Sequence, residues 1–339
     1  MASWAKFTQY TQSKWRWLGY ALSGVALVYL VFLLIQGGVQ LQSVDWIAYA
    51  LVVIYVLGIY LISMMVQAFI WVRMISFYQP TSWRDIAIYA RSILMRRMPG
   101  GIWHWVGRST FYANETQASN KAVALANILE MLMLLLVAGA IIIAGFTQTP
   151  WALHYILPVI IISLATIVGT LWQPKKRHLW QRITESLGWI SLYSFAWLLG
   201  GWIIFLFVET GGGQIQLNLV RATWIWAITG GSTLFLVFIP AGVGIREVTL
   251  GYLLGPYTSV TDILVIVILL RISFTLADIL WGGAGWLLSA SFTKGKNKAP
   301  SNNLPPPPKD RYIEYCTQVL SARRWSEPYL HRQLHPPLP

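Results

Sequence analysis

Arg246 and Glu247 directly follow a glycine-rich interruption, IPAGVG, which contains Pro240, Gly242 and Gly244 in an otherwise apolar stretch. Glycine lets a backbone approach a ligand closely, and an interrupted helix leaves backbone N–H groups with partial positive charge. Together with the guanidinium of Arg246, these groups suit the binding of a phosphate. The alternative is that Arg246 only extends to a membrane interface and pairs with Glu247.

Two further charged residues, Glu130 and Arg271, stand alone inside long apolar runs. Because an unpaired charge at the centre of a membrane costs about 2.5–3.5 kcal/mol, we expect them to face each other or a polar cavity. Arg271 could hold an anionic head group while Glu130 sets its geometry, or the two form a purely structural ion pair. Asp278, seven residues after Arg271 on the same helical face, is a second candidate partner.

A second interruption, MPGGI at 98–102, has basic residues on both sides. These residues would form the cytoplasmic entrance of a site for an anionic lipid. Alternatively, the arginines only follow the positive charge bias of cytoplasmic loops, or attract bulk anionic lipid by ~1 kcal/mol each. The candidate residues of this element are Arg96, Arg97, Pro99, Gly100, Gly101, His104 and Arg108.

The elements that position these residues are predicted to be membrane helices. Hydrophobic residues make up 56% of the chain and charged residues 11%, whereas soluble domains carry about a quarter charged residues. Several apolar runs are long enough to cross a ~30 Å hydrocarbon core at ~1.5 Å per residue. Backbone groups in lipid must be paired within the segment, and the runs lack the alternation of barrel strands. The fold class is therefore an all-α polytopic membrane protein.

The remaining composition excludes several classes of function. The formal net charge of +13 lies between the apolar runs, so it indicates membrane topology rather than nucleic-acid binding. The single cysteine and the five scattered histidines show no metal-site spacing, and we expect no metal, no cofactor and no catalytic residue. Most of the 19 tryptophans, Trp71 among them, fall near the ends of apolar runs, as in an aromatic belt.

Lysine and arginine between the runs predict the topology, with both termini in the cytoplasm and the chain in the inner or plasma membrane. A cytoplasmic segment 1–17 precedes a membrane domain 18–291, and a proline-rich, largely disordered cytoplasmic tail occupies 292–339. The six predicted spans are about 18–35, 46–71, 122–145, 153–172, 188–208 and 262–289.

Two apolar segments, 85–108 and 221–239, do not fit this count of crossings. Each must leave one face of the membrane and return to it, because the charged loops on its two sides lie on the same face. We therefore predict two re-entrant or broken helical hairpins, one from each face. Such backbone is tolerated at membrane depth only where protein or a water-filled cavity surrounds it.

The two hairpins also begin an internal repeat, with halves of about 85–145 and 221–289. Pro99 and Pro240 lie 141 positions apart, and so do Glu130 and Arg271. The two halves run in opposite directions across the membrane. Inverted repeats with interrupted helices are typical of transporters with a site near the middle of the bilayer.

Four motifs carry a family resemblance: PGGIWHWVGR at 99–108, NILE at 127–130, IPAGVGIRE at 239–247 and LLR at 269–271. Over about 18–290 the chain resembles the lysylphosphatidylglycerol synthase transmembrane-region family, also called the flippase-like domain family. The resemblance implies handling of lipids between leaflets; in fused members this region flips an aminoacylated phospholipid made by a cytoplasmic transferase domain. Only about fifty residues follow Ser291 here, so we expect no lysyl transfer by this chain. The first motif also departs from the repeat, because Trp103 stands at the position that Gly244 occupies in the second motif.

These observations together predict a flippase that moves an anionic phospholipid or an isoprenoid-linked lipid between leaflets. Its partners would be the lipid head group and the membrane, with no nucleic acid; the oligomeric state stays open. The chain has no P-loop motif, so ATP is not the expected energy source. Two alternatives stay open: a membrane-embedded transferase acting on a lipid-linked substrate, and an accessory subunit whose tail docks a cytoplasmic enzyme.

Overall fold

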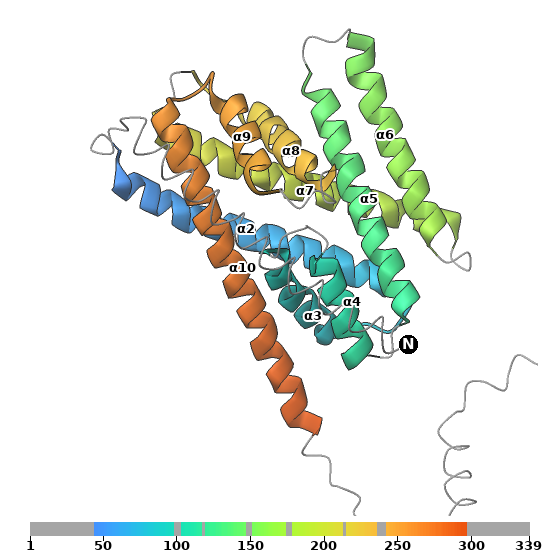
Figure 1. Ribbon diagram of the computed structural model, residues 1–339. Helices are drawn as coiled ribbons and strands as arrows, with labels where there is room; N and C mark the ends of the chain where they lie inside the picture. Colours follow the sequence, from blue (N-terminus) through green and yellow to red (C-terminus); the bar gives the residue numbers. More distant parts are fainter. Residues whose placement is uncertain are drawn as a thin grey trace, which may run out of the picture. The chain divides into compact units, whose positions relative to one another are not determined.

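The computed structural model describes residues 44–97, 103–116, 119–146, 151–173, 178–212, 215–235 and 242–296 (Figure 1). All secondary structure within these segments is helical. The chain divides into two compact units, Met1–Phe292 and Thr293–Pro339, and the helices below belong almost wholly to the first. The elements are α2 (Trp46–Ile75), α3 (Trp83–Ile93), η2 (Leu94–Arg97), α4 (Trp103–Glu115), α5 (Asn120–Ala144), α6 (Trp151–Trp172), α7 (Leu179–Thr210), α8 (Leu219–Phe235), α9 (Gly242–Leu254) and α10 (Val260–Lys296).

Within the described segments, four helices are long and apolar enough to cross a membrane: α2, α5, α7 and the part of α10 from Val260 to Ala290. The prediction of an all-α membrane protein is confirmed at this level. The predicted span 153–172 forms α6, but its described apolar part, Ile156–Trp172, is shorter than a span. The predicted first span, 18–35, lies outside the described residues, as do the segment 1–17 and nearly all of the tail 292–339.

Polar residues at the helix starts define where the helices begin. Asp45 caps α2 by accepting hydrogen bonds from the backbone N–H groups of Ile47 and Ala48, at 3.1 and 3.0 Å. Ser82 and Asp85 form a capping box at the start of α3. These caps satisfy backbone donors that a helix start leaves unpaired, typically worth ~1 kcal/mol each.

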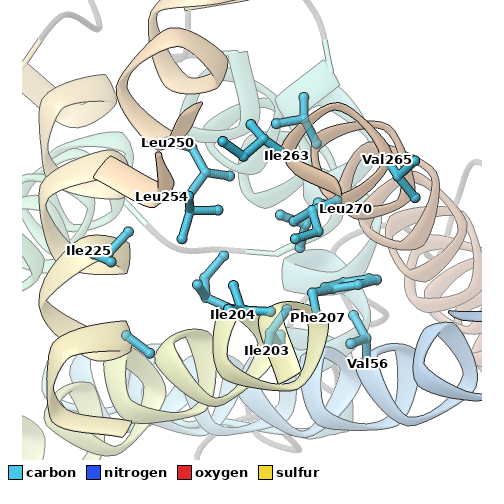
Figure 2. Packing of buried hydrophobic residues seen from close by; sticks show 14 of the residues in the cluster. Val56, Ile203, Ile204, Phe207, Ile225, Leu250, Leu254, Ile263, Val265 and Leu270 are labelled. Atoms are coloured by element: carbon cyan, nitrogen blue, oxygen red, sulfur yellow. The ribbon is translucent and has the colours of Figure 1, made fainter. Parts of the chain in front are cut away.

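Helix α2 is the element that connects the three hydrophobic cores. The first core joins α2 with α7, α8, α9 and α10, the second joins it with α5, α6, α7 and α8, and the third joins it with α3, α4 and α5. Figure 2 shows part of the first core, where Leu254 and Leu270 face Ile204 and Phe207 of α7. Because lipid is as apolar as these side chains, close packing stabilises such contacts more than exclusion of water does.

Side-chain contacts place the helix ends in two groups. The start of α2 meets the start of α10, because the Tyr49 hydroxyl lies 3.5 Å from a carboxylate oxygen of Asp262. The end of α2 meets the end of α4 through a 3.0 Å hydrogen bond from the Trp71 indole to the Tyr112 hydroxyl. The beginning of α5 packs in that same core, so α5 runs opposite to α2. We call the first group the Tyr49 end and the second the Trp71 end.

The pair α3–α4 begins and ends at the Trp71 end. The two helices pack against each other. Arg84, in the first turn of α3, donates to the backbone carbonyl of Glu115, the last residue of α4, at 3.3 Å. The end opposite this junction comprises η2 and the start of α4 at Trp103.

The pair α8–α9 begins and ends at the other group of helix ends. Arg221, near the start of α8, donates to the hydroxyl of Tyr257, just after α9, at 3.2 Å. It also donates to the carbonyl of Gly145, the C-cap of α5, at 3.4 Å. Since α5 ends opposite the Trp71 end, α8 and α9 approach the core from the Tyr49 end.

Glycines in α10 bring it close to α3. A Cβ at position 285 would lie 2.7 Å from the Ala90 Cβ and 3.0 Å from the Ala87 carbonyl oxygen, whereas a Cβ at position 283 would meet nothing within 4 Å. Small residues at such contacts allow helix backbones to approach in a membrane.

We therefore expect opposite effects from the same substitution two residues apart. Gly285→Ala should destabilise the protein by about 1–3 kcal/mol through overpacking. Gly283→Ala should stabilise it by up to about 1 kcal/mol because alanine favours a helix. Thermal unfolding of the detergent-solubilised variants measures both. Equal melting temperatures for the two variants would show that α10 does not dock on α3 in this way.

Candidate functional site

A buried ion pair joins α4 to α5. The Arg108 guanidinium lies 2.6 Å from a carboxylate oxygen of Glu130, and the two side chains are 1% and 3% exposed. Arg108 also donates to the side-chain oxygen of Asn127 at 3.1 Å, and the Tyr89 hydroxyl donates to Glu130 at 3.3 Å. The pair is therefore held by partners on both of its members, as a buried charge requires.

Aromatic rings enclose the guanidinium of this pair. Arg108 lies 4.0 Å from the ring centre of Trp71 and 4.3 Å from that of Tyr89, which are cation–π distances. Trp71 in turn donates to the Tyr112 hydroxyl, which donates to Asp85 at 2.8 Å. Burial is the larger cause of a raised pKa at Tyr112, and the negative charge of Asp85 is the second cause. This phenol therefore stays protonated and acts as a donor.

A second ion pair joins α9 to α10. Arg271 donates from Nε and Nη2 to the same oxygen of Glu247, at 2.8 and 2.6 Å. The side chains are 28% and 13% exposed, so this pair is far more accessible than the Arg108–Glu130 pair. We call the Arg108–Glu130 pair the inner pair and the Arg271–Glu247 pair the outer pair.

The two pairs occupy matching places with opposite charge. Arg108 is the sixth residue of α4, and Glu247 is the sixth residue of α9. Their partners are the eleventh residue of α5 and the twelfth of α10. In the first half the cation lies on the short helix and the anion on the span; in the second half these positions are reversed. The expectation that Glu130 and Arg271 face each other is therefore wrong, because each pairs with a short helix of its own half. The other expectation, that they face a polar cavity, stays a prediction.

A contact between Tyr60 of α2 and Phe274 of the second half lies where the two halves meet. The rings of these residues, from α2 and α10, lie 4.3 Å apart between centres. Arg96, in η2, donates to the Tyr60 hydroxyl at 3.1 Å. Arg246, in α9, lies over Phe274 at 5.1 Å and over Trp226 at 4.5 Å. One arginine from each half thus reaches the same aromatic contact, which we call the central aromatic contact.

The other predicted site residues are placed as follows. Asp278 is buried in α10, 1% exposed, within electrostatic range of Arg96. His104 lies in α4 with its ring 4.7 Å from that of Trp105. Gly242 begins α9, which also contains Gly244. Arg97 ends η2 and nothing is described of its side chain, while Pro99, Gly100, Gly101 and Pro240 lie outside the described residues.

Several residues of this site were not among the sequence candidates. Tyr60, Tyr89 and Phe274 carry no signal beyond their hydrophobicity. Trp71 was interpreted as part of an aromatic belt, and this is wrong for the side chain, which is 0% exposed because α3 and α4 cover it. Asn127 was visible only as part of the NILE motif.

The described segments hold no group of three or more His, Cys, Asp or Glu side chains that could bind a metal ion. Comparison with protein-family models, with curated proteins and with solved structures yields no match to this chain.

Neutralising the carboxylate of each pair should have very different effects on stability. Glu130→Gln leaves a buried arginine unpaired, and we expect a loss of about 3–5 kcal/mol. Glu247→Gln breaks a partly exposed pair, for which about 1 kcal/mol or less is expected. Chemical unfolding of both variants in the same detergent compares them directly. Similar losses at both positions would contradict the difference in burial.

Proposed function

We propose that this protein moves a lipid with an anionic, phosphate-containing head group between the two leaflets of the cell membrane. The observation that carries the proposal is the convergence of one arginine from each half on the central aromatic contact. This arrangement suits a polar site that both halves share and that each can open to its own side. The resemblance to flippase-like membrane regions points to the same class of function.

The contacts of the two short-helix pairs support re-entrant hairpins. Each pair begins and ends at one end of the helix group, α3–α4 at the Trp71 end and α8–α9 at the Tyr49 end. Tyr60 lies 14 residues after the first residue of α2 and 15 before the last, so Arg96 reaches the middle of that helix. A hairpin that enters from one face and reaches the middle of a span has the form expected of broken helices at a transport site.

The charges around the central aromatic contact favour an anion. Four arginines stand against three carboxylates, which leaves one positive charge in excess among these seven residues. Charges at membrane depth are costly unless they are compensated, so an anionic head group is the natural complement. The seven residues are Arg96, Arg108, Arg246, Arg271, Glu130, Glu247 and Asp278.

The distribution of basic residues at the helix ends supports the orientation. Arg73, Arg84 and Lys121 lie at the Trp71 end, whereas Arg221 is the basic residue that connects α8 to α5 at the Tyr49 end. The positive-inside rule then assigns the Trp71 end to the cytoplasm. The α3–α4 hairpin accordingly enters from the cytoplasmic face, and the α8–α9 hairpin from the outer face.

Single cysteines introduced at the two ends test this orientation in intact cells. In a background with Cys316→Ala, we expect Gln216→Cys to react with a membrane-impermeant maleimide from outside. Thr81→Cys should react only after permeabilisation, since it lies in the loop between α2 and α3. Labelling in the reverse order would contradict the proposed orientation.

Transport itself is testable in liposomes that contain a fluorescent phosphatidylglycerol. Dithionite bleaches the outer leaflet, so movement of lipid exposes the protected inner-leaflet pool. We expect wild-type protein to raise the bleached fraction above that of empty liposomes, and Arg246→Gln and Arg271→Gln each to reduce the rate about tenfold or more, as expected for loss of a charged hydrogen-bonding partner.

Arg73→Gln is the matched control, because Arg73 is exposed at the end of α2, where its guanidinium lies 5.6 Å from the centre of the Phe69 ring. It should transport as the wild type does. Equal bleaching with wild-type protein and empty liposomes would contradict the proposal for this lipid. Deleting 294–339 tests the accessory-subunit alternative in cells: a transporter should keep its function without the tail, whereas a subunit that docks an enzyme through the tail should lose it.

A further inference from the structure

We propose that Glu247 is an internal substitute for the phosphate of the substrate: it occupies Arg271 until an anionic head group displaces it, and this exchange releases α9 from α10. This inference rests on the proposed function and assigns Arg271 as a direct ligand of the head group. Glu247 then holds the outer hairpin, α8–α9, against α10 only until an anion binds to Arg271, and it is not a permanent structural partner.

The geometry of the outer pair fits such an exchange. Both donors of Arg271, Nε and Nη2, point to one oxygen of Glu247, at 2.8 and 2.6 Å. A phosphate oxygen accepts from the same edge of a guanidinium in the same way. Head group and Glu247 are thus alternative acceptors for one set of donors, and only one can occupy it.

The exposure of the two pairs shows which one can exchange. Arg271 is 28% exposed and Glu247 13%, so an incoming anion can reach the outer pair. The inner pair is 1% and 3% exposed, with Tyr89 and Asn127 as additional partners. Exchange at the inner pair would first require α4 to move, whereas exchange at the outer pair does not.

The reversed polarity of the pairs determines what exchange does to the fold. At the outer pair the cation belongs to the span α10 and the anion to the short helix α9. An anionic ligand therefore takes the place of the short helix and separates α9 from α10. At the inner pair the cation belongs to α4, so the same ligand would bind to the moving helix and displace the span. Only the outer hairpin is built to be released by an anion.

Arg246 provides a second cation beside the exchange site. Its guanidinium is held over Trp226 at 4.5 Å and over Phe274 at 5.1 Å. Phe274 lies three residues after Arg271 and thus on the same side of α10. A phosphate on Arg271 is therefore close to the helix face that Arg246 covers. The negative charge of the phosphate then takes the place of the negative charge of Glu247 beside both arginines.

Binding measurements on the full-length protein in neutral detergent test the exchange without requiring transport. The probe is dihexanoylphosphatidylglycerol, titrated by calorimetry, with dihexanoylphosphatidylcholine as the probe of similar size without net charge. Removing the competing carboxylate with Glu247→Gln should tighten binding about fivefold, the upper range for an accessible ion pair. Arg271→Gln should weaken binding at least tenfold.

Two further variants separate exchange from general effects. Glu209→Gln removes the same charge from an exposed position at the end of α7 and should leave binding unchanged. The double variant Glu247→Arg with Arg271→Glu keeps an ion pair of reversed polarity; it should melt near the wild-type temperature and bind the anionic probe at least tenfold more weakly.

Unchanged or weaker binding by Glu247→Gln would overturn the inference, as would wild-type affinity in the double variant. Inorganic phosphate is titrated in parallel to identify the source of the anion. If phosphate alone binds and shows the Glu247 dependence, exchange at Arg271 is supported while lipid movement is contradicted. If lipid moves in liposomes but Glu247→Gln does not tighten binding, the proposed function is supported, and the displacement of Glu247 from Arg271 by the head group is contradicted.

Discussion

The cost of placing a charge where water is scarce is the constraint on which the rest of this structure depends. The Arg108 side chain is almost fully buried, yet it carries a permanent charge, so Glu130, Asn127 and two aromatic rings surround it. Those partners come from α2, α3 and α5, and Arg108 itself lies in α4. Satisfying one guanidinium therefore fixes the positions of four helices relative to one another.

Helix α2 carries most of this organisation. It contributes to all three hydrophobic cores, and its residue Tyr60 contacts elements from both halves. The short helices are held in position by packing against this helix and against α10. They are not positioned, as a long membrane span is, by their own length. Elements that depend on a few polar contacts in this way are suited to moving when those contacts change.

Much of the helical framework could be predicted from sequence because apolar run length and loop charge act locally. Glycine and proline also mark breaks locally, but Pro99 and Pro240, which mark the two predicted interruptions, lie outside the described residues. Glu130 and Arg271 were recognised as charges within apolar helices, but only Glu130 is fully buried, and the expected pairing of the two with each other was wrong. Spacing along one helix shows which residues share a face, but it does not show which other helix packs against that face. The pairing of Glu130 with Arg108 could therefore be identified only in the folded structure. Trp71 shows the same limit, because α3 and α4 cover a residue whose position near a span end suggested exposure.

The charges that the two short-helix pairs carry have an electrical consequence for a protein that spans a voltage. Moving one elementary charge through the full potential changes the energy by ~2.3 kcal/mol per 100 mV. In the alternating cycle proposed above, one hairpin leaves the middle of the membrane as the other enters it, and both move in the same direction. At that depth the inner hairpin, α3–α4 with η2, carries Arg96 and Arg108, whereas the outer hairpin, α8–α9, carries Arg246 and Glu247, whose charges cancel. The two displacements would therefore transfer net positive charge, and the membrane potential would act on the protein's own rearrangement as well as on the charge of the cargo.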